Sequence, residues 1–195
     1  MKLDVMTGGL PLRSMQHLAQ HASDAGFAGL VITEAGRTAY LSCAAASLAV
    51  DIEILTGVAV AFPRSPMVTA QTAWELADVS DGRFRLGLGT QVRAHIERRY
   101  SSTFDPPGPR MRDYLLAVRA CFESFRTGTP LDHHGPHYDL SLLPAMWSPG
   151  PIDAPNPPID LAAPPPRTPR AAGQHADGPP APPPPPPPHP RRTVP

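Results

Sequence analysis

Short apolar runs alternate along residues 1–163 with longer segments in which apolar side chains recur every three or four positions. The short runs, rich in β-branched residues, predict β-strands, and the helical spacing predicts amphipathic helices between them. Strands are expected at residues 3–6, 29–34, 52–62, 83–89 and 158–163, and helices at 11–25, 40–50, 66–77 and 111–125. Strands that alternate with helices favour a parallel α/β fold.

Local signals support these boundaries. Pro11 suits the first position of a helix, and Ser65 followed by Pro66 is typical of a capped helix start. Gly26 and Gly128 are expected to end the first and fourth helices. The run "GLVITE" at 29–34 is almost continuously apolar, which indicates a strand buried on both faces, as in parallel sheets.

Two architectures fit this order of elements. A doubly wound sheet could end at five strands. An eight-stranded (β/α)8 barrel typically needs about 250 residues, so a chain of 195 residues would supply only part of one. The pattern alone leaves both open.

Composition changes abruptly near residue 163. Of the 29 prolines, 15 lie in the last 32 residues, beginning at Pro164. Because proline has no backbone N–H and a fixed φ, this segment suits no packed core. We therefore predict a folded domain at 1–163 and a disordered or polyproline II tail at 164–195, which could be a ligand for modules with aromatic grooves.

Net charge, cysteine content and hydropathy argue against several classes of protein. The 17 basic and 17 acidic residues give a net charge of zero, which argues against a nucleic-acid surface and slightly favours self-association, here as a homodimer. Cys43 and Cys121 lie in helical patterns and are expected to be reduced core thiols. No apolar stretch approaches the ~20 residues of a membrane span, and the N-terminus has no signal-peptide pattern, so a cytoplasmic protein is expected.

Several motifs that resemble functional sites are better explained by structural roles. Gly87-x-Gly89 resembles a dinucleotide fingerprint, but Val92 replaces its third glycine and it follows the fourth strand, which disfavours a nicotinamide site. His17 and His21 are four residues apart without the glutamate of a metalloprotease motif, so solvated side chains are favoured. "HHGPHYDL" at 133–140 is interpreted as a hairpin tip rather than a metal site. There is no Gly-x-Ser-x-Gly elbow, and no metal is expected.

Small and polar residues lie at the ends of three predicted strands: Glu34, the stretch 57–60, and the stretch 89–91. In parallel α/β folds, ligands bind at the carboxyl ends of the strands. A glycine inside the third strand, Gly57, permits a bulge or the close approach of a flat ligand, although it could also simply relieve crowding in the core.

Three stretches carry a resemblance to a known family: "DAGFAGLVITE", "LTGVAVAFPRSPMVTAQTAWELADVSDGRFRLGLGTQV" and "PPIDLAAPPPRTPRAAGQHADG". They resemble the luciferase-like monooxygenase superfamily, and within it the deazaflavin (coenzyme F420)-dependent oxidoreductases. The resemblance covers residues 1–178. It implies an (α/β)8 TIM barrel, incomplete here with about five strands.

The resemblance also implies a cofactor, F420 or alternatively FMN, at the carboxyl ends of the strands. The reaction would be hydride transfer between the deazaflavin C5 and a small organic substrate. A bulge in the third strand, often with a non-prolyl cis peptide, would support the ring at Ala59-Val60. Further cofactor contacts are expected from the following residues: Glu34, Gly89, Thr90 and His95.

Two departures from the family pattern affect the expected chemistry. Ala35 and Val92 stand where a sugar-phosphate dehydrogenase branch has a proton-donating His and a Glu, so no catalytic acid or base is assigned. Residues 163–166, Ala-Pro-Pro-Pro, replace a glycine-containing loop that would donate backbone N–H groups to the cofactor phosphate. A non-catalytic remnant of the family is therefore the alternative to an enzyme.

Overall fold

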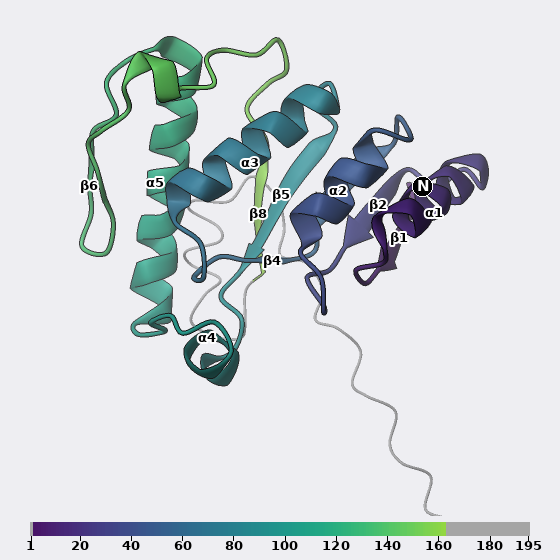
Figure 1. Cartoon of the computed structure of the whole chain (residues 1–195), viewed down its shortest axis with the longest axis horizontal. Helices are drawn as coiled ribbons and strands as arrows, with labels where there is room; N and C mark the ends of the chain where they lie inside the picture. The colour runs from purple at the N-terminus through teal and green to yellow at the C-terminus, as the bar shows by residue number, and fades with distance from the viewer. Residues whose placement is uncertain (1, 163–195) are drawn as a thin grey trace, which may run out of the picture.

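A parallel β-sheet forms the centre of the computed structural model, which describes residues 2–162 (Figure 1). Its strands are β1 (Asp4–Thr7), β2 (Gly29–Ile32), β3 (Glu53–Thr56), β4 (Ala59–Val60), β5 (Phe84–Gly89) and β8 (Ile159–Leu161). Their spatial order is β1-β2-β3-β5-β4, with β8 also paired to β5. Because β3 and β4 are two pieces of one predicted strand, the sheet has five strand positions of a barrel that needs eight.

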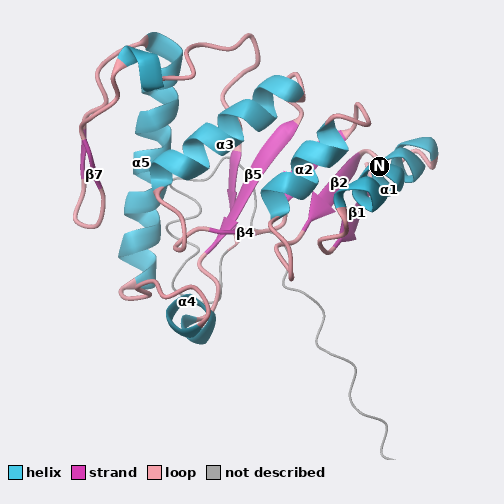
Figure 2. Cartoon of the chain, in the orientation of Figure 1, coloured by secondary structure: helices cyan, strands magenta, loops and turns pink. Residues whose placement is uncertain are grey.

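Helices cover one side of this sheet. They are α1 (Leu12–Asp24), α2 (Ala39–Ser47), α3 (Pro66–Val79) and α5 (Pro107–Thr127), with the short α4 (Arg93–Arg98) directly after β5. Figure 2 shows α2 and α3 in front of the strands, with α1 and α5 at the two ends of the molecule. The parallel α/β architecture predicted from the alternating pattern is confirmed, as an incomplete sheet of the barrel type.

Register explains where the core lies. Leu30, Ile54 and Phe84 are aligned across β2, β3 and β5, and all three are fully buried under the helices. The neighbouring positions Val31 and Leu55 point to the opposite, concave face and are only half-buried among the described residues. The sequence predicted that the second strand would be buried on both faces. In the structure its helix-facing residues are fully buried, whereas Val31 on the other face is only half-buried.

The ends of the helices agree closely with the capping residues predicted from the sequence. The Ser65 hydroxyl accepts a hydrogen bond from the Val68 N–H at 3.2 Å at the start of α3. Gly128 has φ of 71° directly after α5, a conformation that favours glycine. Pro11 differs slightly from the expectation, since it precedes α1 and Leu12 is the first helical residue.

The segment after α5 forms a hairpin whose strands are β6 (His133–His134) and β7 (Asp139–Leu140). This confirms the hairpin predicted for residues 133–140. It is attached to α5 by the buried carboxylate of Asp113, which contacts His133 Nε2 at 2.9 Å and accepts from the backbone N–H groups of His137 and Tyr138 at 2.7 and 2.9 Å. His133, through its ring, and His137, through its backbone N–H, therefore help to attach the hairpin to α5.

Both cysteines are buried and free, as predicted. Burial raises the pKa of the Cys121 thiol to about 12, so it stays protonated and unreactive at neutral pH. No helix in the range 2–162 is long and apolar enough to cross a membrane. The predicted tail at 164–195, the boundary at 163 and the Ala163–Pro166 loop lie outside the described residues.

Candidate functional site at the carboxyl ends of the strands

The carboxyl ends of β2, β4 and β5 meet at one edge of the sheet, because all the strands are parallel. Glu34 follows β2 closely, and its carboxylate Oε2 accepts a hydrogen bond from the Val60 N–H at 2.7 Å. Val60 is in turn aligned with Gly89 of β5. Thus the structure brings together Glu34, Ala59, Val60 and Gly89, which were predicted from separate strands.

Two residues, Gly57 and Val58, separate β3 from β4 and interrupt the regular strand; they are here called the step. The peptide bond between Gly57 and Val58 is a non-prolyl cis bond. The Gly57 N–H donates to the Ile32 carbonyl at 2.8 Å, and the Val58 carbonyl accepts from the Glu34 N–H at 3.3 Å. The step is therefore hydrogen-bonded to β2 and to Glu34 in the loop after β2.

The predicted position of this cis bond, Ala59-Val60, is wrong by two residues. Ala59 and Val60 have regular backbone because they pair in parallel with Leu88 and Gly89, and both are buried. The irregular step instead occurs at Gly57, where a Cβ would lie 2.2 Å from Val31 Cγ1, so only glycine fits. Whether Ala59 and Val60 contact a cofactor stays a prediction.

In the segment 57–60, the residues that are partly exposed to solvent are those of the step. Gly57 and Val58 are both half-buried, unlike the two residues that follow. The Met6 methyl group, from β1, lies about 4.0 Å from the position that a Gly57 Cβ would take, and Met6 is 54% exposed. Met6, Val31, Gly57 and Val58 therefore form an apolar surface, here called the shelf, on the concave face near the carboxyl ends.

Arg64 is the main component of the site that the sequence did not reveal. Its guanidinium pairs with both carboxylate oxygens of Glu34, at 2.9 Å from Nη1 to Oε2 and by a very short contact from Nη2 to Oε1. Nη1 also donates to the Val60 carbonyl at 2.8 Å. Arg64 additionally reaches the Thr38 hydroxyl at 3.4 Å and lies over the Tyr40 ring.

The Glu34–Arg64 pair is largely shielded from solvent. The Glu34 side chain is only 5% exposed. Partial burial alone would lower the pKa of Arg64, but the hydrogen bond to Glu34 and the charge of Glu34 outweigh it and raise that pKa. Glu34 and Arg64 thus fix both the N–H and the carbonyl of Val60, and so hold β4 against the loop after β2.

Glycines in β5 permit close contact with the step. A Cβ at Gly87 would lie 1.9 Å from the Thr56 carbonyl oxygen, and one at Gly89 would lie 2.6 Å from Val58 Cγ2. The Thr56 hydroxyl also bridges to Gly87, donating to its carbonyl and accepting from its N–H, both at 2.8 Å. Gly89 therefore has a packing role in addition to the cofactor contact predicted for it.

We expect Gly87→Ala to lower the free energy of unfolding by about 3 kcal/mol, because the added methyl group forces β3 and β5 apart. Gly108→Ala is the matched control, since Gly108 lies in α5 and an added methyl group there would have no other group within 4 Å. Alanine at this position should be neutral or stabilise by up to about 1 kcal/mol. Urea unfolding of both variants measures the difference, and equal stability of the two would contradict this packing.

The two remaining predicted contacts lie farther along the chain. Thr90 is half-buried after β5, and its hydroxyl donates to the Gln91 carbonyl at 3.1 Å. His95 is exposed on α4, and no contact within the described part of the chain joins its ring to Glu34 or Val60. Their contacts with a cofactor stay predictions.

Charged residues of α4 and of the segment after it have partners on the protein surface. Arg93 bonds Glu97 at 2.9 Å and contacts Asp105, and Arg99 lies over the Tyr100 ring. Arg93 and Glu97 are therefore exposed helix charges that pair with each other. Within residues 2–162, no group of three or more His, Cys, Asp or Glu side chains is arranged to hold a metal ion.

A family model decides the classification of this fold and site. The model described as luciferase-like monooxygenase matches residues 2–189. The chain belongs to the luciferase-like monooxygenase family. This confirms the family resemblance of the sequence.

Relatives of the chain within this family include two proteins of Mycobacterium tuberculosis. An uncharacterized protein is 39% identical over 127 residues, which cover 65% of this chain and 37% of that protein. A protein provisionally named a coenzyme F420-dependent oxidoreductase is 33% identical over 137 residues, covering 69% of this chain and 39% of that protein. The chain thus spans well under half the length of the curated relatives that it matches.

Solved structures confirm the fold. The F420-dependent tetrahydromethanopterin reductase of Methanopyrus kandleri superimposes with a TM-score of 0.72 at 19% identity, over 90% of this chain and 54% of the reductase. The oxygenating component of 3,6-diketocamphane monooxygenase from Pseudomonas putida, in complex with FMN, gives 0.61 at 18% identity, over 84% and 51%. An F420-dependent reductase and an FMN-bound monooxygenase component therefore share this fold.

Proposed function

We propose that this chain provides the cofactor-binding part of an F420-dependent oxidoreductase, with the cofactor ring on the shelf at the carboxyl ends of the strands. The observation that carries the proposal is the step at Gly57-Val58. It is half-exposed on the concave face and held from behind by the Glu34–Arg64 pair through Val60. An apolar surface whose backbone is held by hydrogen bonds suits one face of a tricyclic ring.

The residues present fit such a ring in shape and polarity. Met6, Val31 and Val58 offer apolar contacts, and Gly57 lets the ring approach the backbone closely. The bound cofactor would supply hydride transfer to or from a small organic substrate, and the protein would supply position and polarity. Arg64 and Glu34 would contribute by keeping the step fixed, so that the orientation of the ring is set before the substrate binds.

F420 is favoured over FMN by the relative at 33% identity whose name specifies F420. FMN is the second candidate, because a structural neighbour with the same fold was solved with FMN. Both cofactors carry phosphate and so are anionic, which means that a negative charge placed on the shelf should weaken either one.

Titration of the chain with F420 and with FMN, followed by cofactor fluorescence, tests the proposal. We expect saturable quenching at micromolar F420 and weaker binding of FMN. Met6→Glu, which introduces a negative charge on the shelf, should weaken F420 binding about tenfold or more, a change of roughly 1.4 kcal/mol or more.

Leu3→Glu is the matched control, because Leu3 is also 54% exposed but lies at the amino end of β1. It should change affinity less than about twofold. If FMN binds more tightly than F420, FMN takes the place of F420 as the proposed cofactor. If neither cofactor binds, the chain acts as the non-catalytic remnant considered from its sequence.

A further inference from the structure

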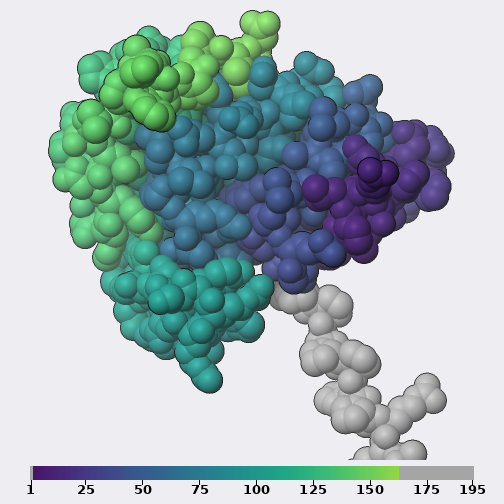
Figure 3. Space-filling view, in the orientation of Figure 1, coloured from purple at the N-terminus to yellow at the C-terminus, as the bar shows by residue number. Residues whose placement is uncertain are grey.

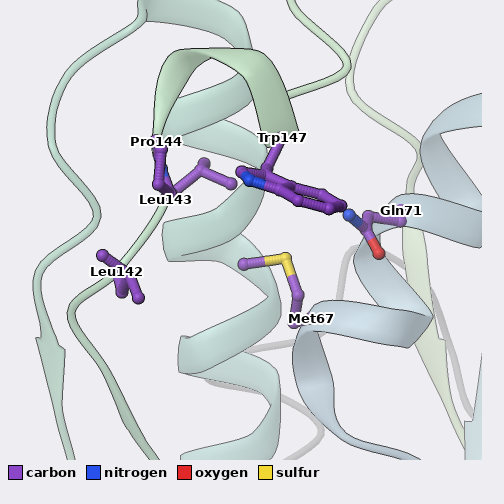
Figure 4. Close-up of a pocket in the computed structure, with 6 residues that line it drawn as sticks. All are labelled: Met67, Gln71, Leu142, Leu143, Pro144 and Trp147. Atoms are coloured by element: carbon purple, nitrogen blue, oxygen red, sulfur yellow. The ribbon is translucent and has the colours of Figure 1, made fainter.

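A second surface feature lies on the helical side of the molecule, away from the shelf. A pocket of about 270 Å³, here called the α3–η1 pocket, opens between α3 and the segment at 141–147, which includes the 3-10 helix η1 (Ala145–Trp147). It is lined by Met67, Gln71, Leu142, Leu143, Pro144 and Trp147. Figure 4 shows the Trp147 ring extending towards Gln71, with the Met67 side chain beneath it.

The rim of this pocket is apolar and includes an exposed tryptophan. Leu142 is 79% exposed, Met146 is 85% exposed and Trp147 is 68% exposed. In the space-filling view the green segment that contains them lies on the outside of the molecule beside α3 (Figure 3). Single exposed apolar residues are common, but a cluster of large ones around a pocket marks a contact site.

The polar groups of the α3–η1 pocket are hydrogen-bond donors without a partner. The Gln71 amide and the Trp147 indole N–H can both donate, and neither side chain forms a hydrogen bond with another group within residues 2–162. No charged side chain is among the residues that line the pocket. The pocket therefore suits a neutral, apolar segment that has hydrogen-bond acceptors.

A proline-rich segment of the same chain has this chemistry. Residues 182–188 are seven consecutive prolines within the segment 179–190, which lies outside the described residues. Prolines carry apolar rings and backbone carbonyl acceptors but no backbone N–H. Such a sequence favours polyproline II, the form that docks into grooves lined by aromatic side chains at little cost in chain entropy.

We propose that residues 179–190 dock into the α3–η1 pocket of their own chain as a polyproline II segment. The prolyl rings pack against Trp147 and Met67, and prolyl carbonyls accept hydrogen bonds from the Gln71 amide and the Trp147 indole N–H. The aromatic groove that the tail requires is therefore part of the same protein.

The length of the chain after β8 allows this contact. The last described residue is Ala162, directly after β8, so residues 163–178 connect it to the docking segment. Extended, this connection spans about 50 Å, whereas a domain of this size has a radius of gyration of about 15 Å. A tether of this kind gives an effective concentration of about 1 mM, so a contact with a dissociation constant of about 0.3 mM is formed in about three chains of four.

Charge complementarity gives the docked segment a direction. Arg191 and Arg192 directly follow it in the sequence. Glu75 is exposed on α3, four residues after Gln71 and therefore on the same face of the helix, and its carboxylate has no ion pair among the described residues. The arginines complement this carboxylate, which favours binding with the carboxyl end of the segment towards Glu75.

Acrylamide quenching of tryptophan emission in the full chain tests the proposal. Trp74 is fully buried, so quenching reports on Trp147, and a Trp147→Ala chain supplies the Trp74 signal to subtract. The triple variant Pro183→Ser, Pro185→Ser and Pro187→Ser leaves no two prolines of the seven-proline run three residues apart, the spacing of one polyproline II turn. We expect its quenching constant to be about two- to fourfold higher than that of the unaltered chain, because Trp147 is no longer covered.

The matched control replaces the three prolines at 164–166 by serine, because it makes the same change in the same tail and leaves 179–190 intact. Its quenching should equal that of the unaltered chain. An unaltered chain that is quenched as readily as the triple variant would overturn the proposal. Shielding that rises with protein concentration between about 1 and 50 µM would mean that a neighbouring copy supplies the segment, and would overturn docking within one chain.

Calorimetric titration with a decaproline peptide tests whether the pocket takes polyproline and whether the tail already fills it. The unaltered chain should bind the peptide about fourfold more weakly than the triple variant, because only about a quarter of its pockets are open. Adding Trp147→Ala to the triple variant should abolish binding. Equal affinities would show that the tail leaves the pocket open, and a triple variant that does not bind would show that the pocket takes no polyproline; either result overturns the proposal.

Discussion

Replacing Trp74 by alanine is expected to lower the free energy of unfolding by about 3–5 kcal/mol. Trp74 joins α3 to α5, and it is fully buried with its ring centroid 5.6 Å from those of both Phe122 and Phe125. Its Nε1 donates to the Gly150 carbonyl at 2.9 Å, and the Arg126 guanidinium lies over its face. Alanine would remove the stacked ring and leave a cavity that rigid helices cannot fill.

Trp147→Ala is the matched control for this prediction. Trp147 is the other tryptophan and is mostly exposed, so the same substitution should change the stability of the monomer by less than about 1 kcal/mol. Urea unfolding at low protein concentration, followed by circular dichroism, separates the two. Similar losses in both variants would mean that the α3–α5 contact is not a main source of stability.

Replacing Arg64 by methionine should lower stability by about 2–3 kcal/mol and weaken cofactor binding at least about tenfold. The substitution leaves the nearly buried Glu34 carboxylate without its cation and frees the Val60 carbonyl. Because Arg64 itself is partly exposed, the loss is expected to be smaller than for a fully buried pair. Its effect on binding would be indirect, since Arg64 bonds Val60 of β4 and Glu34, and the Glu34 N–H donates to the Val58 carbonyl of the step.

A double-mutant cycle distinguishes this role from simple loss of packing. Glu34→Gln keeps an acceptor for the Val60 N–H, and the double variant removes the unpaired charge. We expect Arg64→Met combined with Glu34→Gln to be more stable than Arg64→Met alone, while cofactor binding stays weak. Losses in stability that simply add would contradict a coupled pair.

The elements of the fold were predictable because each depends on local pattern. The capped start at Ser65 and the left-handed Gly128 are set by near neighbours in the chain, and the parallel order follows from the alternation of strands with helices. The family was predictable because three stretches of the sequence resemble it, and the family model matches residues 2–189.

The exact geometry of the site was not predictable from one sequence. The step occurs at Gly57 rather than at Ala59-Val60, and Gly57 is required there by the close approach of Val31, a contact from another strand. Arg64 pairs with Glu34 across 30 residues, and periodicity carries no information on such a pair. One signal was present, since Arg64 lies two residues after the end of the predicted strand at 52–62 and directly before the Ser65 cap.

The most direct measurement of the central claim is a crystal structure of the chain with bound F420. The predicted result places the ring against Met6, Val31 and the Gly57-Val58 step, with the Glu34–Arg64 pair intact behind β4. A ring bound elsewhere, for example in the pocket between α3 and η1, or a Glu34 carboxylate turned away from Arg64, would contradict it.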